Sequence, residues 1–134
     1  MGYYRAALVT CVIGDIFLTL AFIAFIYVLY RVQQSPSLLT SIAFILPAAL
    51  WLLSLVFLLI AFLLSIGVRS HALGLSFGYG AAIHVLFIIT IITQAIITQG
   101  VLPTDPFLLG ILVLLLGIPA VLALLLGIAA TKRF

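Results

Sequence analysis

Asp15 and His84 are the two ionisable side chains that lie deep inside long apolar stretches of this sequence. A carboxyl or imidazole group inside a membrane can relay a proton or couple to an ion, and it is costly there unless neutralised or paired. Counted from the same side of the membrane, Asp15 and His84 lie at similar depths in their helices, within about 5 Å of each other along the axis. We therefore predict a buried polar pair, direct or through one neighbour, that acts as a relay or as a structural contact between helices.

A second chemistry is suggested by the spacing of His71 and His84, which are thirteen residues apart. This spacing resembles that of haem-ligating histidines in cytochrome b helices, with Gly74, Gly78 and Gly80 between them to admit a flat ring. The chain has only two histidines, so a second copy or a partner subunit would have to supply the other ligands. The sequence shows no metal-ligand cluster, nucleophile motif or phosphate loop. We therefore expect no enzymatic activity, no cofactor and no metal.

The composition excludes an ordinary water-soluble domain. Of the 134 residues, 68% are hydrophobic and 5% are charged, whereas soluble domains carry about 25% charged residues. No charge occurs between Arg31 and Arg69 or within residues 106–131, and gaps of that length can cross a membrane. A single cysteine, Cys11, excludes an internal disulfide and is typical of a small buried apolar side chain.

The hydrophobic pattern predicts a single all-α domain built as an up-down bundle or as an antiparallel pair of hairpins. Its four expected helices cover residues about 4–30, 37–66, 71–99 and 106–130. The connections are short, and a proline inside a helix removes one backbone hydrogen bond. Pro47 and the Gly117–Pro119 segment therefore predict bends in the second and fourth helices.

The third apolar segment, residues 70–100, has a polar stripe along its length. At about 100° per residue, one face collects several of its residues, with His84 roughly 60° to the side. These residues are Leu73, Ser76, Gly80, Phe87, Gln94 and Thr98. Because hydrogen-bonding groups need partners in hydrocarbon, this face is expected to point inward, with the other helices packed around it.

Small residues recur three or four positions apart in the fourth helix, where they favour a close helix–helix contact. They are Gly117, Ala120, Ala123 and Gly127.

The basic residues lie at helix ends and connections. Those predicted to share one side of the membrane are Arg5, Arg69, Lys132 and Arg133, while Arg31 and Asp105 lie on the other. The excess of positive charge on the first side predicts that both termini are cytoplasmic in a bilayer.

In size, four-helix layout, near absence of charge and short basic ends, the chain resembles the highly hydrophobic major capsid proteins of archaeal spindle-shaped viruses. The resemblance covers the whole chain and rests on composition and layout. It implies a self-assembling protein that sits in the host membrane and then forms a virion around DNA. The partners would be further copies, lipid and DNA, whose phosphates the four shared cations would contact.

Two alternatives stay open. One is an accessory subunit of a respiratory or other membrane enzyme complex, in which the apolar surfaces meet larger subunits. The other is a small homo-oligomeric transporter that uses Asp15. In this respect Gly14-Asp15-Ile16 with Thr19 resembles the first helix of small multidrug-resistance transporters, whose acid is a glutamate.

Overall fold

The computed structural model describes residues 3–34, 44–66, 68, 70–97 and 106–131, and every element in these ranges is an α-helix. The helices are α1 (Tyr3–Gln34), α3 (Ile45–Leu64), α4 (His71–Ile97) and α5 (Pro106–Thr131). They confirm the all-α prediction. Several residues named above lie outside the described ranges, so their predictions stay predictions: Arg69, Thr98, Asp105, Lys132 and Arg133.

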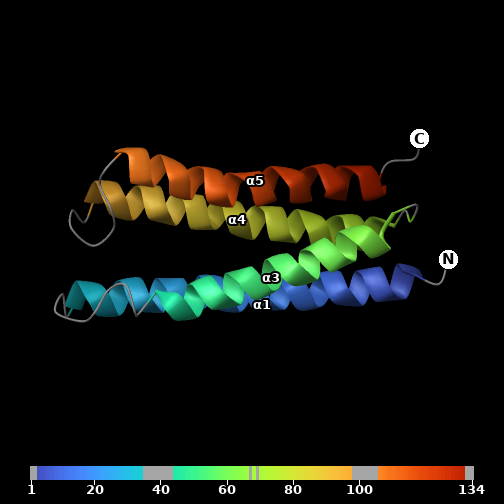
Figure 1. Cartoon of the computed structure of the whole chain (residues 1–134), viewed down its shortest axis with the longest axis horizontal. Coiled ribbons are helices and arrows are strands. Elements are labelled where there is room, and N and C mark those ends of the chain that lie inside the picture. Colours follow the sequence, from blue (N-terminus) through green and yellow to red (C-terminus); the bar gives the residue numbers. More distant parts are fainter. Residues whose placement is uncertain (1–2, 35–43, 67, 69, 98–105, 132–134) are drawn as a thin grey trace.

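The helices form two antiparallel hairpins that lie side by side (Figure 1). In one hairpin α1 packs along α3, and in the other α4 packs along α5. The main contact between the hairpins is that of α1 with α4. The first residues of α1 and the last residues of α5 therefore lie at the same end of the molecule.

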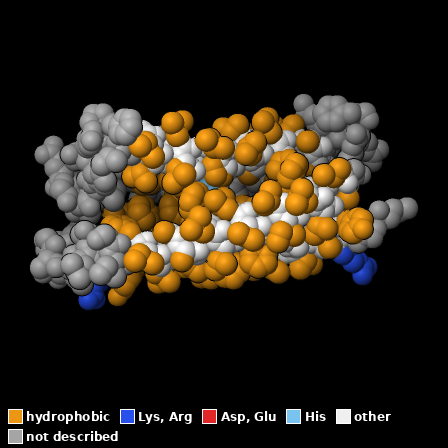
Figure 2. Space-filling view, viewed as in Figure 1, with side chains coloured by type: hydrophobic (Ala, Val, Ile, Leu, Met, Phe, Trp, Pro, Cys, Tyr) orange, Lys and Arg blue, Asp and Glu red, His pale blue; other side chains and the backbone are white. Residues whose placement is uncertain are grey.

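Each of the four helices is long and apolar enough to cross a membrane. Large apolar side chains are exposed along all of them, among them Ile16, Leu53, Leu75 and Leu114. Figure 2 shows one face covered by apolar side chains, with the described basic side chains at the two ends. Because a water-soluble monomer rarely exposes so much contiguous apolar surface, the protein is membrane-associated.

The polar face predicted for α4 points inward from Leu73 to Phe87, whereas Gln94, further along the same face, is only partly buried. Leu73, Ser76 and Phe87 are each at most 9% exposed. Further along α1 and α4, aromatic rings join the hairpins. Phe87 lies edge-on to Phe22 at 5.1 Å between ring centroids, and it packs at 5.4 Å from Phe25. α4 therefore contacts α5 of its own hairpin and α1 of the other.

Pro47 does not interrupt the described part of α3. The helix begins at Ile45, which places Pro47 in its first turn. Backbone amides in the first turn have no partner within the helix, so the amide that proline lacks costs nothing there. The predicted bend at Pro47 is therefore wrong for the described helix.

The close contact between α4 and α5 forms around Gly127, which faces Gly74. A Cβ atom at Gly127 would lie 2.9 Å from the Gly74 carbonyl oxygen, whereas a Cβ at Gly117 would meet nothing within 4 Å. Ala120 and Ala123 are buried as expected, each 6% exposed. Inclusion of Gly117 in this contact is therefore wrong, because it lies about 80° around the helix from Gly127.

Candidate functional site

The Asp15 carboxyl group lies at the seam between the hairpins. The Ser76 hydroxyl of α4 donates a hydrogen bond of 2.6 Å to Asp15 Oδ2. The second oxygen, Oδ1, is buried and has no hydrogen-bond partner among the described residues. Gly80 makes room for it, since a Cβ there would lie 3.1 Å from Oδ1. Asp15 is 7% exposed, so this carboxyl group is held by one donor in an apolar surrounding.

Two hydroxyl groups lie beside this carboxyl group. The Thr19 hydroxyl donates to the Asp15 backbone oxygen at 2.8 Å and lies 2.6 Å from the Tyr79 hydroxyl. Because Thr19 has only one hydroxyl hydrogen, Tyr79 must be the donor between them. Asp15, Thr19 and Tyr79 line a cleft of about 400 Å³ that also has walls from Val12, Ile16 and Leu20. Asp15 and these two hydroxyl groups therefore border one cleft between α1 and α4.

His84 lies in a separate polar contact, between α3 and α4. The Trp51 indole N–H donates to His84 Nε2 at 2.9 Å, and His84 Nδ1 lies 2.9 Å from the Gly80 carbonyl oxygen. An indole can only donate and a carbonyl can only accept. The geometry therefore fits a neutral imidazole with its hydrogen on Nδ1. Since His84 is 0% exposed, this contact locks α3 onto α4.

Asp15 and His84 are both buried, but they do not hydrogen-bond to each other. Both groups lie beside Gly80. Asp15 Oδ1 is 3.1 Å from the position that a Cβ atom at Gly80 would take, and His84 Nδ1 forms a hydrogen bond with the Gly80 carbonyl oxygen. The direct form of the predicted pair is therefore wrong, and only an indirect approach through Gly80 is present. Asp15 and His84 do not pair directly because each has its own hydrogen-bond donor: Ser76 donates to Asp15, and Trp51 donates to His84.

No protein-family model, curated protein or solved structure matches this chain. The haem interpretation does not fit the geometry of the site, because both ring nitrogens of His84 already have partners. His71, the other proposed ligand, is exposed at the start of α4.

Sequence reasoning missed Trp51 and Tyr79 as members of these polar contacts. Trp51 is the only indole in the chain and lies in an otherwise apolar helix. Its N–H needs an acceptor in such a place, which is a signal that the sequence contains. Tyr79 lies inside α4 rather than at a helix end, where tyrosine is common in membrane proteins. The position of Tyr79 is therefore a second signal in the sequence for a polar contact inside the molecule.

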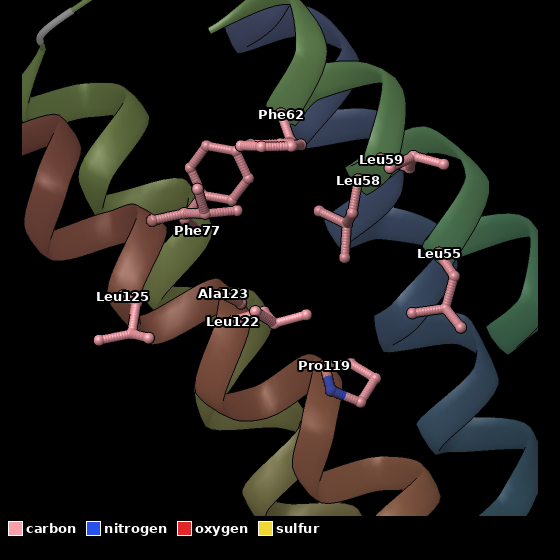
Figure 3. Close-up of a pocket in the computed structure, with 10 residues that line it drawn as sticks. Leu55, Leu58, Leu59, Phe62, Phe77, Pro119, Leu122, Ala123 and Leu125 are labelled. Carbon is pink, nitrogen blue, oxygen red and sulfur yellow. The ribbon is translucent and has the colours of Figure 1, made fainter. Parts of the chain in front are cut away.

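An apolar groove lies on the other side of the seam, between α3 and α5 (Figure 3). Its volume is about 350 Å³. Leu58 and Phe62 belong to one wall, Pro119 and Leu122 to the other, and Phe77 of α4 also lines it. The groove offers packing surface only, because all of its lining side chains are apolar.

We expect Trp51→Phe to lower the free energy of unfolding by about 1–2 kcal/mol, because it leaves His84 Nε2 buried without a donor. Unfolding in mixed micelles with increasing SDS, followed by helix content, measures this change. In a double-mutant cycle with His84→Leu, the second substitution should cost less once Trp51 is replaced. Strictly additive effects would show that the two side chains do not depend on each other.

Proposed function

We propose that the protein is a structural subunit that assembles with copies of itself in a membrane, and that the final assembly is a viral capsid around DNA. The observation that carries the proposal is the large apolar surface that one copy leaves unused. α3 buries only four of its 20 residues within the molecule: Pro47, Ser54, Leu58 and Ala61. Such a surface suits lipid contact before assembly and contact with neighbouring copies afterwards.

The groove between α3 and α5 supports the same proposal. Its lining atoms have no packing partners across about 350 Å³, and each missing contact forfeits dispersion energy. Apolar side chains from a neighbouring copy would restore those contacts. The polar seam at Asp15 and the contact of Trp51 with His84 hold the two hairpins of one copy together, as a building block requires.

The DNA part of the proposal rests on charge. Arg5 is exposed near the start of α1, at the end of the molecule where α5 finishes. Lys132 and Arg133 follow the last residue of α5 in the sequence. Basic side chains bind DNA mainly through its phosphates, which requires no specific motif.

The full chain, purified in mild detergent and then returned to lipid, tests the proposal. We expect an ordered homopolymer by electron microscopy and co-purified DNA. Replacement of Lys132 and Arg133 by Gln should lower DNA content and reduce the slope of log affinity against log salt by about 2, with helix content unchanged. Arg31→Gln, at the opposite end of α1, is the matched control and should leave the slope unchanged.

Three results would count against the proposal. A chain that stays monomeric in lipid is not a self-assembling subunit. Isolation with many different chains favours the accessory-subunit alternative, and a small oligomer that moves ions across liposomes favours the transporter. If the Lys132 and Arg133 variant changes only membrane topology, these residues are positive-inside signals and the capsid interpretation loses its electrostatic support.

A further inference from the structure

The polar seam contains one unsatisfied atom. Asp15 Oδ2 accepts the 2.6 Å hydrogen bond from Ser76, but Oδ1 has no hydrogen-bond partner within the described residues. A buried acceptor without a partner is unfavourable, and more so when it is charged. Within the described residues, one oxygen of this carboxyl group therefore lacks a hydrogen bond.

The described residues also leave the charge of Asp15 unbalanced. Arg5 and Arg31 are the described lysine or arginine side chains, and they lie near the two ends of α1. At the helical rise they are about 15 Å and 24 Å from Asp15 along the axis. A carboxylate in the middle of a membrane helix is expensive without a positive partner. A bound cation would provide one.

The groups around Asp15 show which cation fits. On α1 the nearest other titratable group is Cys11, one turn earlier and fully buried. From α4 come Tyr79, at the cleft, and His84, whose nitrogens face Trp51 and a backbone oxygen. From α3, the other helix packed on α1, Leu58 approaches this region with carbon atoms only. None of these neighbours carries a positive charge in this geometry.

The available donors are hard oxygen atoms and one carboxylate. Ser76 and Asp15 supply the buried oxygens, and Thr19 and Tyr79 supply hydroxyls at the cleft. No group of three or more His, Cys, Asp or Glu side chains that could hold a metal occurs in the described part of the chain. A divalent ion would lack charged ligands here, whereas one positive charge balances one carboxylate.

We propose that the Asp15 carboxyl group binds one small monovalent cation, H⁺ or Na⁺, at Oδ1. Either ion removes the negative charge of the carboxylate, and Na⁺ also coordinates Oδ1. The hydroxyl groups of Thr19 and Tyr79 line the same cleft as Asp15 and lie beside this site. This binding site goes beyond the structural function proposed above and does not depend on it.

A hydrophobic carbodiimide provides the test, because it modifies carboxyl groups in their protonated form. The full chain in liposomes is treated with the reagent, and the modified fraction of the peptide containing Asp15 is measured by mass spectrometry. We expect modification to fall as the pH rises. If Na⁺ is the ligand, Na⁺ at constant pH slows modification several-fold relative to choline. If H⁺ alone is the ligand, the two salts give the same rate.

Two serine variants make a matched pair. Ser76→Ala removes the donor that stabilises the charged carboxylate. The reagent should therefore still modify Asp15 after the proton concentration is lowered by a further factor of roughly ten or more. Ser54→Ala makes the same change at a serine that is also buried but donates to the Trp51 backbone oxygen instead. It should leave the profile of Asp15 unchanged. Helix content and SDS resistance of both variants show whether the fold is kept.

The proposal would be overturned by modification of Asp15 that is independent of both pH and Na⁺, because the group would then exchange no cation. Equal shifts for Ser76→Ala and Ser54→Ala would also overturn it, since the effect would not come from the hydrogen bond to Asp15.

Discussion

Gly127→Leu is expected to separate α4 from α5 and to lower the free energy of unfolding by about 3 kcal/mol. A Cβ atom at Gly127 would lie 2.9 Å from the Gly74 carbonyl oxygen and 3.3 Å from the Gly78 amide nitrogen. These are backbone atoms of a helix, which cannot move aside as a flexible side chain can. Overpacking of this kind usually costs about 1–3 kcal/mol, and the rigid neighbours place this case at the upper end. SDS-induced unfolding followed by helix content measures the loss.

Gly117→Leu is the matched control for this experiment. It makes the same substitution in the same helix, but a Cβ at Gly117 would meet nothing within 4 Å. We expect a change below about 0.5 kcal/mol, as for other substitutions away from packed contacts. Similar losses at Gly127 and Gly117 would contradict the observed contact, because leucine favours a helix more than glycine does and helix propensity cannot explain a loss.

The second large effect is expected for Phe77→Ala, at about 3 kcal/mol. Phe77 is 1% exposed and packs in the core cluster at this end of the bundle, beside Ala61 and Leu73. Truncation of a buried phenylalanine leaves a cavity and usually costs about 3–5 kcal/mol in soluble proteins. In a membrane, a side chain outside the protein core is surrounded by lipid and not by water. Part of the transfer energy is therefore absent, but the cost of lost packing remains. The lower end of that range is therefore expected.

Phe62→Ala provides the comparison, because Phe62 lines the same groove but is 36% exposed. Its ring has fewer protein neighbours to lose, so the expected cost is below about 1 kcal/mol. Unfolding midpoints of the two variants in the same micelles measure the difference. A larger loss for Phe62→Ala would mean that the groove, rather than the core beneath it, stabilises the monomer.

The sequence alone determined the fold class and which side of α4 is buried. Long apolar segments with basic residues only at their ends predict membrane helices from composition, which needs no knowledge of neighbours. The stripe containing Leu73, Ser76 and Phe87 points inward because polar groups are costly in hydrocarbon and helical spacing is regular. Both effects are local, so they can be predicted before any tertiary contact is known.

Only the tertiary structure decided which polar groups meet. Ser76 and His84 are eight residues apart on α4, so an axial shift of about 12 Å between α1 and α4 changes which of them reaches Asp15. No residue in the sequence specifies that shift, because it results from packing along the whole length of both hairpins. The same packing brought Trp51 to His84 and left Asp15 Oδ1 without a partner.

In the contact between α4 and α5, too, one part follows from the sequence and another part only from the tertiary structure. The sequence identified Ala120, Ala123 and Gly127 as a surface for close approach, because small side chains at this spacing lie on one side of a helix. The choice of Gly74 as the facing residue, and the exclusion of Gly117, depended on the rotation of each helix about its axis. That rotation is a compromise among all contacts of the helix, so only the assembled structure determines it.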